Sequence, residues 1–508
     1  MPQPNIAFIR WELRKFWALY ALIRDCLDGE VSVKAAGRRY LPMPNAADQS
    51  PENLARYKAY VERAVFYNAT KRTLAGLCGQ VFLRDPVVEV PTNLDLVIAD
   101  ATGSKVSVEQ LAKRALQYTL GYGRGGLLAD YPAVDGPATR EQLVNGDIRP
   151  TVSLYSPWQI LNWRTIQRGA RQILSLVVLA ERYTLSDDGF EMKLANQWRV
   201  LSLDEAGQYK VDLWQDVSPI NASNIDQIPK LTRNQTSAKL TQTIYPKDVN
   251  GNALTEIPFI FFGAENNDDM PDYPPLYDLA SINIAHYRNS ADYEEASFIV
   301  GQPTPYFAGL TEEWVKDVLK GTVSLGARGA VPLPEGGSAG LLQVQPNTMP
   351  FEAMEHKERQ MIALGAKLVE QKQVQRTATE AVIENTSENS TLSSSAKNVS
   401  AAFVDALKWC MRFVGGDEGK IKFELNTEFD LSKMTADERR QLIAEWQAGA
   451  IAFPEMRAAL RKSGIAELDD DKAKALIEQE LANAPQLEQP GGGNMPNKGD
   501  KKNNQGGQ

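Results

Sequence analysis

The chain has 508 residues, of which 43% are hydrophobic and 23% charged, a composition typical of a globular protein with more than one domain. Its 55 Lys and Arg stand against 64 Asp and Glu, which gives a formal net charge of −9. Tight binding to nucleic acid draws on Lys and Arg that displace counterions, so this balance excludes a protein built to grip DNA, although DNA could still pass it.

Cysteine and histidine usage excludes several kinds of site. Cys26, Cys78 and Cys410 lie far apart without CxxC spacing, so we expect neither a disulfide framework nor a zinc site, and a reducing compartment fits. His286 and His356 are the only histidines, which argues against histidine-based catalysis or metal binding. No apolar run approaches the ~18 residues of a membrane span.

Residues 5–25 read as an aromatic, amphipathic helix. Arg10, Glu12 and Arg14 interrupt it, so it lacks the apolar core of a signal peptide. We favour a helix packed on its own protein or on a neighbouring subunit. A helix lying in a membrane interface is the alternative.

The next segments alternate between helix and strand. Residues 51–79 predict one helix, a strand broken at Pro86 follows, and residues 107–120 predict a second helix. Gly121, Gly123 and Gly126 then spell G-x-G-x-x-G. A dinucleotide fingerprint follows a strand and opens a helix, whereas here a helix precedes and a strand follows, so we expect a helix C-cap and turn.

Residues 150–262 are mainly strand-like, which predicts an antiparallel β region flanked by helices and hence an α+β fold. The acidic cluster that follows lacks the glycine and the terminal Glu of a calcium loop. We interpret it as a solvated turn that caps the next helix. The cluster consists of Asn266, Asp268, Asp269 and Asp272.

Residues 274–300 predict a helix of unusual length, opened by Pro274 and Pro275 and ended by a Gly/Pro break at 301–305. At ~1.5 Å per residue it would be roughly 35 Å long. No face is apolar along its whole length, so neighbours, copies of itself or a second domain should pack against it.

A Gly/Pro-rich module at 301–349 precedes a second long helix that reaches about residue 370, which places the module at the end of a two-helix stalk. A polar loop, a helix with a buried stripe at 392–414 and a strand follow, then three short helices within 435–484. The tail from residue 485 has the composition of a disordered segment.

Several segments together resemble the portal proteins of tailed bacteriophages, in particular a portal family catalogued as a domain of unknown function. The resemblance covers roughly residues 50–470. It is carried by RYKAYVERAVFYNATKRTLAGLCGQVF (56–82), LGYGRGGLLADYP (120–132), SLYSPWQILNWR (153–164), EIPFIFFGAENND (256–268), LYDLASINIAHYRNSADYEEASFIVGQPTPYFAGL (276–310), TATEAVIENTSENSTLSSSAKNVSAAFVDAL (377–407) and GAIAFPEMRAALRKSGI (449–465).

The resemblance implies a portal fold: a mixed α/β wing, two stem helices flanking a small α/β clip, a tunnel loop or helix, and a helical crown. On this sequence the parts would be a wing at 1–273, stem helices at 274–300 and 350–371, a clip at 301–349, a tunnel loop at 372–391, a wing or tunnel helix and strand at 392–433, a crown at 434–485 and a disordered tail at 486–508.

The implied function is a ring, expected to be dodecameric, at one capsid vertex of a virion assembled in the host cytoplasm. Double-stranded DNA would pass through it during packaging and ejection. Its implied partners are terminase, the major capsid protein, scaffold, and tail or adaptor proteins. The resemblance implies no enzyme activity, no cofactor, no metal and no membrane.

It also suggests residues for three surfaces. The tunnel loop would contact DNA through Lys367, Lys372 and Arg376, and the stem would contact neighbouring subunits through His286, Arg288, Asp292 and Glu295. The clip would contact terminase or adaptor through Trp314, Leu319 and Arg328. The alternatives left open are a nucleotide-binding enzyme built on Gly121–Gly126, a peripheral membrane protein anchored by residues 5–25, and another phage head protein such as a major capsid subunit.

Overall fold

The computed structural model divides the chain into two units, Met1–Phe429 and Asp430–Gln508. The residues that it describes are 5–132, 148–220, 238–248, 250–302, 304–319, 331–342, 348–368, 390–427, 429, 436–462, 465–466, 468 and 470–483. The first unit contains the sheets and the long helices, and the second contains only helices among its described residues.

The antiparallel β region predicted at 150–262 is present and forms most of two sheets. The larger sheet has the order β4-β5-β6-β7-β8 and is a meander of consecutive antiparallel strands. Its strands are β4 (Ile160–Arg168), β5 (Arg171–Asp187), β6 (Met192–Leu203), β7 (Tyr209–Pro219) and β8 (Lys239–Ile244).

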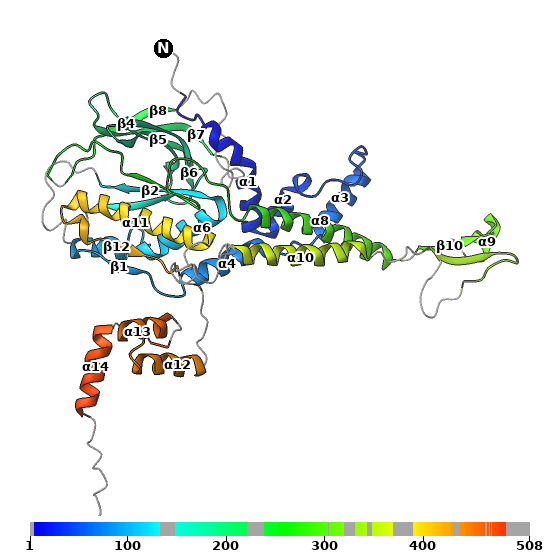
Figure 1. Cartoon of the computed structure of the whole chain (residues 1–508). Coiled ribbons are helices and arrows are strands. Elements are labelled where there is room, and N and C mark those ends of the chain that lie inside the picture. The colour runs from blue at the N-terminus through cyan, green and yellow to red at the C-terminus, as the bar shows by residue number, and fades with distance from the viewer. Residues whose placement is uncertain are drawn as a thin grey trace, which may run out of the picture. The chain divides into compact units, whose positions relative to one another are not determined.

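A three-stranded sheet has β2 (Arg124–Asp130) between β3 (Thr151–Tyr155) and β9 (Phe259–Gly263), with both pairings antiparallel. Figure 1 shows α6 (Val108–Tyr122) and α11 (Thr391–Val414) packed against this sheet. The apolar stripe predicted for the helix at 392–414 is confirmed, since its members are all buried. They are Leu392, Ala396, Val399, Phe403, Ala406, Leu407, Cys410 and Phe413.

The remaining helices of the first unit precede these sheets in the chain. They are α1 (Trp11–Asp28), α2 (Glu30–Ala35), α3 (Pro51–Arg63), α4 (Ala69–Val81) and α5 (Asp95–Ala99), with short 3₁₀ turns at Gly37–Arg39, Thr92–Leu94 and Glu418–Lys420. The last strand of the first unit, β12 (Lys422–Glu424), pairs with β1 (Val87–Glu89).

The single helix predicted at 51–79 was wrong, because residues 64–68 separate α3 from α4. Asn68 accepts a hydrogen bond from the backbone N–H of Lys71 and so caps α4 (3.0 Å). A helical spacing of apolar residues on both sides of the break hid it, since the cap residue alone is a weak signal. The strand predicted on both sides of Pro86 is also shorter, because α4 continues to Val81 and β1 starts only at Val87.

The glycine motif lies where the sequence predicts. Gly123 ends α6 in the left-handed region with φ 71°, and β2 starts at the next residue. A Cβ on Gly123 would lie 2.6 Å from the backbone oxygen of Asp272, so only glycine fits. Gly126 belongs to β2, where a Cβ would collide with the Phe259 ring. The motif therefore joins a helix to a strand and does not open a helix toward a nucleotide.

The two long helices are α8 (Tyr277–Val300) and α10 (Met349–Lys367), and Figure 1 shows them side by side. They run antiparallel, because His286 contacts Glu358 while Tyr293, further along α8, contacts Phe351, earlier in α10. Between them in the chain lies a small module in which β10 (Thr304–Ala308) pairs with β11 (Ser338–Leu342) and α9 (Glu312–Asp317) intervenes.

The second unit contains α12 (Ala436–Gln447), α13 (Phe453–Lys462) and α14 (Asp470–Asn483), close to the three helices predicted there. A contact between the tilted rings of Trp446 and Phe453 joins the first two, with ring centroids 5.9 Å apart. Arg461 pairs with Asp470 and joins the last two.

Candidate assembly surface on the long helices

One face of α8 is buried along most of its length, and that face is partly polar. Its buried residues are Leu279, Ala280, Asn283, Ile284, His286, Tyr287, Ser290 and Ala291. The sequence predicts packing on a helix without an apolar face, and part of that packing occurs within the chain. The polar members contact backbone groups and charged side chains of other elements, which explains why they are tolerated there.

Asn283 and Ser290 bind the segment that separates α3 from α4. The Asn283 side-chain oxygen accepts from the backbone N–H of Thr70 (3.1 Å) and from its hydroxyl (2.9 Å). Its Nδ2 donates to the carbonyl of Tyr67 (2.7 Å), and Ser290 Oγ accepts from the N–H of Val65 (3.1 Å). The non-helical backbone at 64–68 and the first turn of α4 thus obtain hydrogen bonds that a continuous helix would have supplied.

The stem residues predicted at a subunit interface all have partners inside the chain. The Arg288 guanidinium donates to the carbonyl of Tyr40 (2.7 Å), and Asp292 accepts from the Tyr60 hydroxyl (2.6 Å). Glu295 pairs with Arg63 and with Arg56 (3.4 Å). They hold α3 and the preceding turn against α8, and their role between subunits stays a prediction.

His286 is 4% exposed and lies between α8 and α10, where its Nε2 is 3.3 Å from Glu358 Oε1. Burial lowers the pKa of His286, because desolvation of the charged ring outweighs the attraction of Glu358. Lys357 lowers the pKa further, and the Tyr67 ring lies 5.9 Å away. The imidazole is therefore neutral at neutral pH.

The two long helices expose apolar side chains, most of them at the ends nearest the small module. Phe298 and Ile299 of α8 are 44% and 40% exposed, and Met349 and Ile362 of α10 are each 72% exposed. A pocket of about 300 Å³ lies beside them between α3 and α8, and Tyr60 and Asp292 help to line it. Exposed apolar side chains gathered on paired helices indicate a surface that another protein covers.

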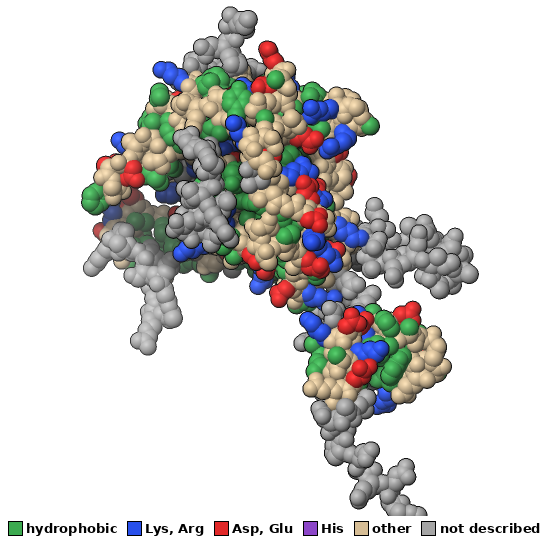
Figure 2. Space-filling model, turned by 90° about the vertical axis from the view of Figure 1, so that its left-hand side faces the viewer, with side chains coloured by type: hydrophobic (Ala, Val, Ile, Leu, Met, Phe, Trp, Pro, Cys, Tyr) green, Lys and Arg blue, Asp and Glu red, His purple; other side chains and the backbone are tan. Residues whose placement is uncertain are grey.

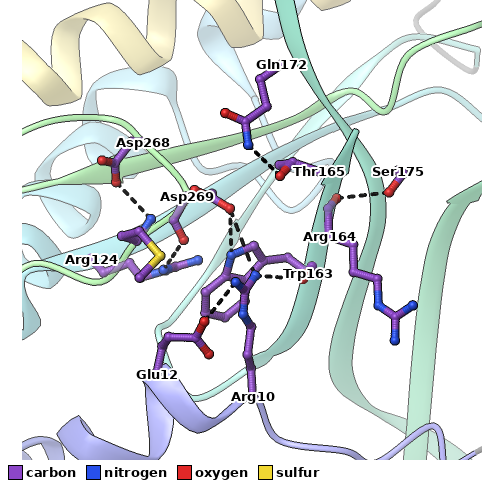
Figure 3. A network of polar contacts seen from close by, with 11 residues as sticks. Arg10, Glu12, Arg124, Trp163, Arg164, Thr165, Gln172, Ser175, Asp268 and Asp269 are labelled. Atoms are coloured by element: carbon purple, nitrogen blue, oxygen red, sulfur yellow. Dashed lines mark hydrogen bonds and ion pairs between the residues drawn. The ribbon is translucent and has the colours of Figure 1, made fainter. Parts of the chain in front are cut away.

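The acidic turn before α8 departs from the prediction in part, because Asp269 and Asp272 are directed into the protein. Asp268, in contrast, is exposed and accepts from the backbone N–H of Met270 (2.8 Å) (Figure 3). Asp269 Oδ2 accepts from Trp163 Nε1 (3.1 Å) and its backbone oxygen accepts from Arg124 Nη1 (2.7 Å). Asp272 Oδ2 accepts from the backbone N–H of Glu265 (2.8 Å), and burial raises the pKa of Asp272. No side chain caps α8, so the turn organises the sheets instead of the helix end.

Arg124 is the centre of this network, and it is 1% exposed on β2. Its guanidinium carbon lies 4.0 Å from the centre of the Trp163 ring and 4.2 Å from that of Phe261, so it is stacked between two aromatic rings. Burial lowers its pKa to about 10. Among the described residues its Nε and Nη2 have no hydrogen-bond partner.

A second arginine connects the network to the N-terminal segment. Arg10 donates to the carbonyl of Trp163 (2.9 Å), pairs with Glu12 (2.8 Å) and lies 4.0 Å from Asp269 (Figure 3). The residues before α1 are thereby fixed to β4. The sequence contains one signal of this network, which is Arg124 within a glycine-rich strand. The residues that contact Arg124 lie far from it in the chain, so the sequence does not identify them.

Of the other predicted site residues, only some lie within the described part of the chain. Trp314 is half-buried in the small module and donates from Nε1 to the carbonyl of Pro332 (3.2 Å), and Leu319 is half-buried nearby in sequence. Lys367 is the last residue of α10. Lys372, Arg376 and Arg328 lie outside the described residues.

Neither a concentrated basic patch on the face that Figure 2 shows nor a metal site in the described part of the chain accompanies these surfaces. On the face drawn in Figure 2, Lys and Arg side chains are interspersed with Asp and Glu rather than gathered into one basic patch. Within the described residues there is no His, Cys, Asp and Glu cluster able to hold a metal ion. The helices of the described chain include none both long and apolar enough to span a membrane.

Comparison with known proteins gives one family match and several structural similarities. A family described as a domain of unknown function (DUF4055) matches residues 275–414, the range from the start of α8 to the end of α11. A comparison with curated protein sequences finds no match.

Three similar solved structures come from gene transfer agent (GTA) particles. A chain in the virion of the native particle is 14% identical, with 81% of this chain and 93% of that chain covered and a TM-score of 0.39. A chain in the neck of the empty particle, computed with C6 symmetry, is 15% identical over 79% and 91%, with a TM-score of 0.40. A chain in the neck of the native particle, computed with C12 symmetry, is 15% identical over 84% and 98%, with a TM-score of 0.38.

Proposed function

We propose that this chain is a portal-type subunit that assembles into a ring at one vertex of a phage-like capsid. The observation that carries the proposal is the antiparallel pair of α8 and α10 that flanks the β10–α9–β11 module. That arrangement matches the stem and clip that the sequence resemblance implies. The wing would correspond to the sheets and the crown to the helices of the second unit.

The exposed apolar side chains of the stem helices support a ring. Phe298, Ile299, Met349 and Ile362 are each at least 40% exposed, and in a ring each stem has a neighbour on both flanks. Because that contact joins two different flanks of the same fold, it can repeat until the ring closes. We expect twelve subunits.

The charged stem residues belong to the same proposal. Arg288, Asp292 and Glu295 reach the surface while bonded to Tyr40, Tyr60 and Arg63. Their remaining acceptor and donor positions would meet the next subunit. His286 would act indirectly, by holding α10 against α8.

The ring would serve as the channel for DNA packaging and ejection within the virion. Lys367, Lys372 and Arg376 would give weak phosphate contacts around a channel whose acidic balance otherwise allows a duplex to slide. The clip, with Trp314, Leu319 and Arg328, would dock terminase during packaging and tail or adaptor proteins afterwards. The major capsid protein and scaffold would surround the wing.

Two other functions fit the geometry less well. A nucleotide-binding enzyme would need the glycine motif to open a helix, whereas Gly123 closes one. A peripheral membrane protein would need a free apolar face on α1, yet Leu13, Tyr20 and Ile23 of α1 are buried in the protein core.

Electron microscopy of negatively stained, purified protein tests the proposal, with the mass measured in solution in parallel. Closed rings with a central hole would support it and give the subunit number. A small stable dimer, particularly one whose melting temperature rises on adding nucleotides, would contradict it.

A further inference from the structure

The tip of the β5–β6 hairpin presents two exposed apolar side chains. Phe190 is 102% exposed and Met192 is 54% exposed. β4 pairs with β5 only as far as Leu179, and the β6–β7 pairing ends at Ala195, so the tip extends beyond both neighbouring strands. A large aromatic side chain fully in water has no role in the core of its own chain.

The tip is held in one conformation by its own carboxylates. Asp188 Oδ1 accepts from the backbone N–H groups of Phe190 (2.9 Å) and Glu191 (2.7 Å), and Asp187 Oδ1 accepts from Gly189 (2.8 Å). These bonds lower the pKa of Asp188, so its charge persists at neutral pH. A backbone held in this way loses little conformational freedom on binding, which suits an anchor.

The charge around Phe190 defines the kind of partner. Asp187, Asp188 and Glu191 surround it, with Lys193 as the nearest counter-charge along the strand. An anionic lipid surface would repel this tip. A complementary surface must instead be apolar and basic.

The start of α1 has that composition. Phe8 is 43% and Trp11 59% exposed, and Arg14 and Lys15 project from the same helical face as Trp11. The Lys15 ammonium lies 4.3 Å from the Trp11 ring centre, and the Arg14 guanidinium lies 5.6 Å from that of Phe8. Glu12 turns inward to Arg10 and leaves this aromatic-basic face without an acidic side chain of its own.

We propose that the β5–β6 tip of one copy docks on the aromatic-basic face of α1 in a neighbouring copy. Phe190 would pack on Trp11, and Glu191 would pair with Lys15. The two surfaces differ, so the contact is heterologous and propagates from copy to copy until it closes. This inference rests on the proposed function, because it requires several copies of the chain in one assembly.

Cysteine cross-linking of the full-length protein tests the contact. The native Cys26, Cys78 and Cys410 are buried, so introduced cysteines would dominate the chemistry. We expect Lys15→Cys combined with Glu191→Cys to give, on mild oxidation, a ladder of products larger than dimers. Each single variant should lack the ladder.

Lys15→Cys combined with Glu205→Cys is the matched control, because Glu205 is exposed on the turn at the opposite end of β6. It should give at least ~10-fold less cross-linked product, since a specific contact places only one pair in reach. Equal yields from the two pairs, or dimers from Lys15→Cys alone, would overturn the proposal.

Charge exchange supplies a second readout that does not depend on oxidation. Lys15→Glu and Glu191→Lys should each weaken association about threefold, as expected for an exposed ion pair, and together they should restore it. Phe190→Ser should weaken it about tenfold without harming the fold. Glu205→Lys should have no effect.

The outcomes separate this inference from the proposed function. If rings form but the Lys15→Cys and Glu191→Cys pair does not cross-link, this inference is wrong and the portal proposal is unaffected. A ladder that stops at dimers, from protein that forms no rings, would overturn both.

Discussion

Asn283 illustrates how single polar side chains stabilise this chain. It is fully buried on α8 and satisfies the N–H of Thr70 and the carbonyl of Tyr67. Asn283→Ala should lower the free energy of unfolding by about 1–3 kcal/mol, because the buried N–H of Thr70 would lose its partner. Urea denaturation measures the change.

Ser281→Ala is the control for that prediction. Ser281 is exposed on the same helix, so its replacement should leave stability within about 0.5 kcal/mol of the wild type. Equal stability for the two variants would mean that the 64–70 segment does not depend on Asn283.

His286 makes stability depend on pH. Its pKa is lowered from 6.5 in the folded chain, so the unfolded chain binds a proton at higher pH than the folded chain does. The free energy of unfolding should therefore fall as pH drops below about 6.5, and the contribution should be constant above that value. Urea denaturation at about pH 7.5 and about pH 5.5 measures the difference.

His286→Gln is the comparison, because it removes the titrating group. Its loss of stability over the same pH interval should be smaller than that of the wild type. An identical loss would show that His286 does not determine the pH dependence.

At the scale of elements, the α6–β2 junction is the most constrained turn. Gly123 has φ 71° and lies against the backbone of Asp272 and Tyr273, whereas Gly207 has φ 76° with open space around it. Gly123→Ala should cost about 2 kcal/mol more than Gly207→Ala, since both carry backbone strain but only the first adds a steric collision. Thermal or urea unfolding of the two variants decides this, and equal costs would contradict the close packing.

Sequence reasoning succeeded where one element carries its own signal. The periodic apolar residues of α11 and the order of helix, glycine and strand around Gly123 are local, so both were predicted correctly. The break between α3 and α4 was missed, because α8, more than two hundred residues away, supplies the hydrogen bonds that stabilise it.

The site was less predictable for the same reason. The turn at 266–272 reads as solvated in sequence, yet Asp269 binds Trp163 and Arg124 across two sheets. The helical spacing of α8 places Asn283 and Ser290 on one face without revealing that backbone would face them. Their polarity indicated packing, and only the tertiary structure identifies the partner.

At the scale of the whole molecule, the order of long helix, small module and returning long helix attaches the module to the rest of the chain through α8 and α10 alone. The His286–Glu358 and Tyr293–Phe351 contacts fix the two helices against each other. In the proposed function, this module would contact one partner and the sheets another.

In the proposed ring, the loop predicted after α10 would face the DNA that passes through the central channel. A duplex carries one charge per ~1.7 Å of axis, so a strongly basic channel wall would slow its passage. A few cations would allow the duplex to slide and would still help to keep packaged DNA inside. Lys372→Ala combined with Arg376→Ala should therefore alter DNA packaging or retention while leaving the rings intact. Packaged DNA per particle and its loss over time measure the effect.

Arg168→Ala combined with Arg171→Ala, in the turn between β4 and β5, removes the same charge from a site distant from the loop in sequence. This control should package and retain DNA like the wild type, because only cations beside the duplex form phosphate contacts. If the loop variant also behaved like the wild type, residues 372–391 would not line the channel. If it disrupted the rings, the loop would belong to the subunit interface, and the contacts with DNA would have to come from another part of the chain.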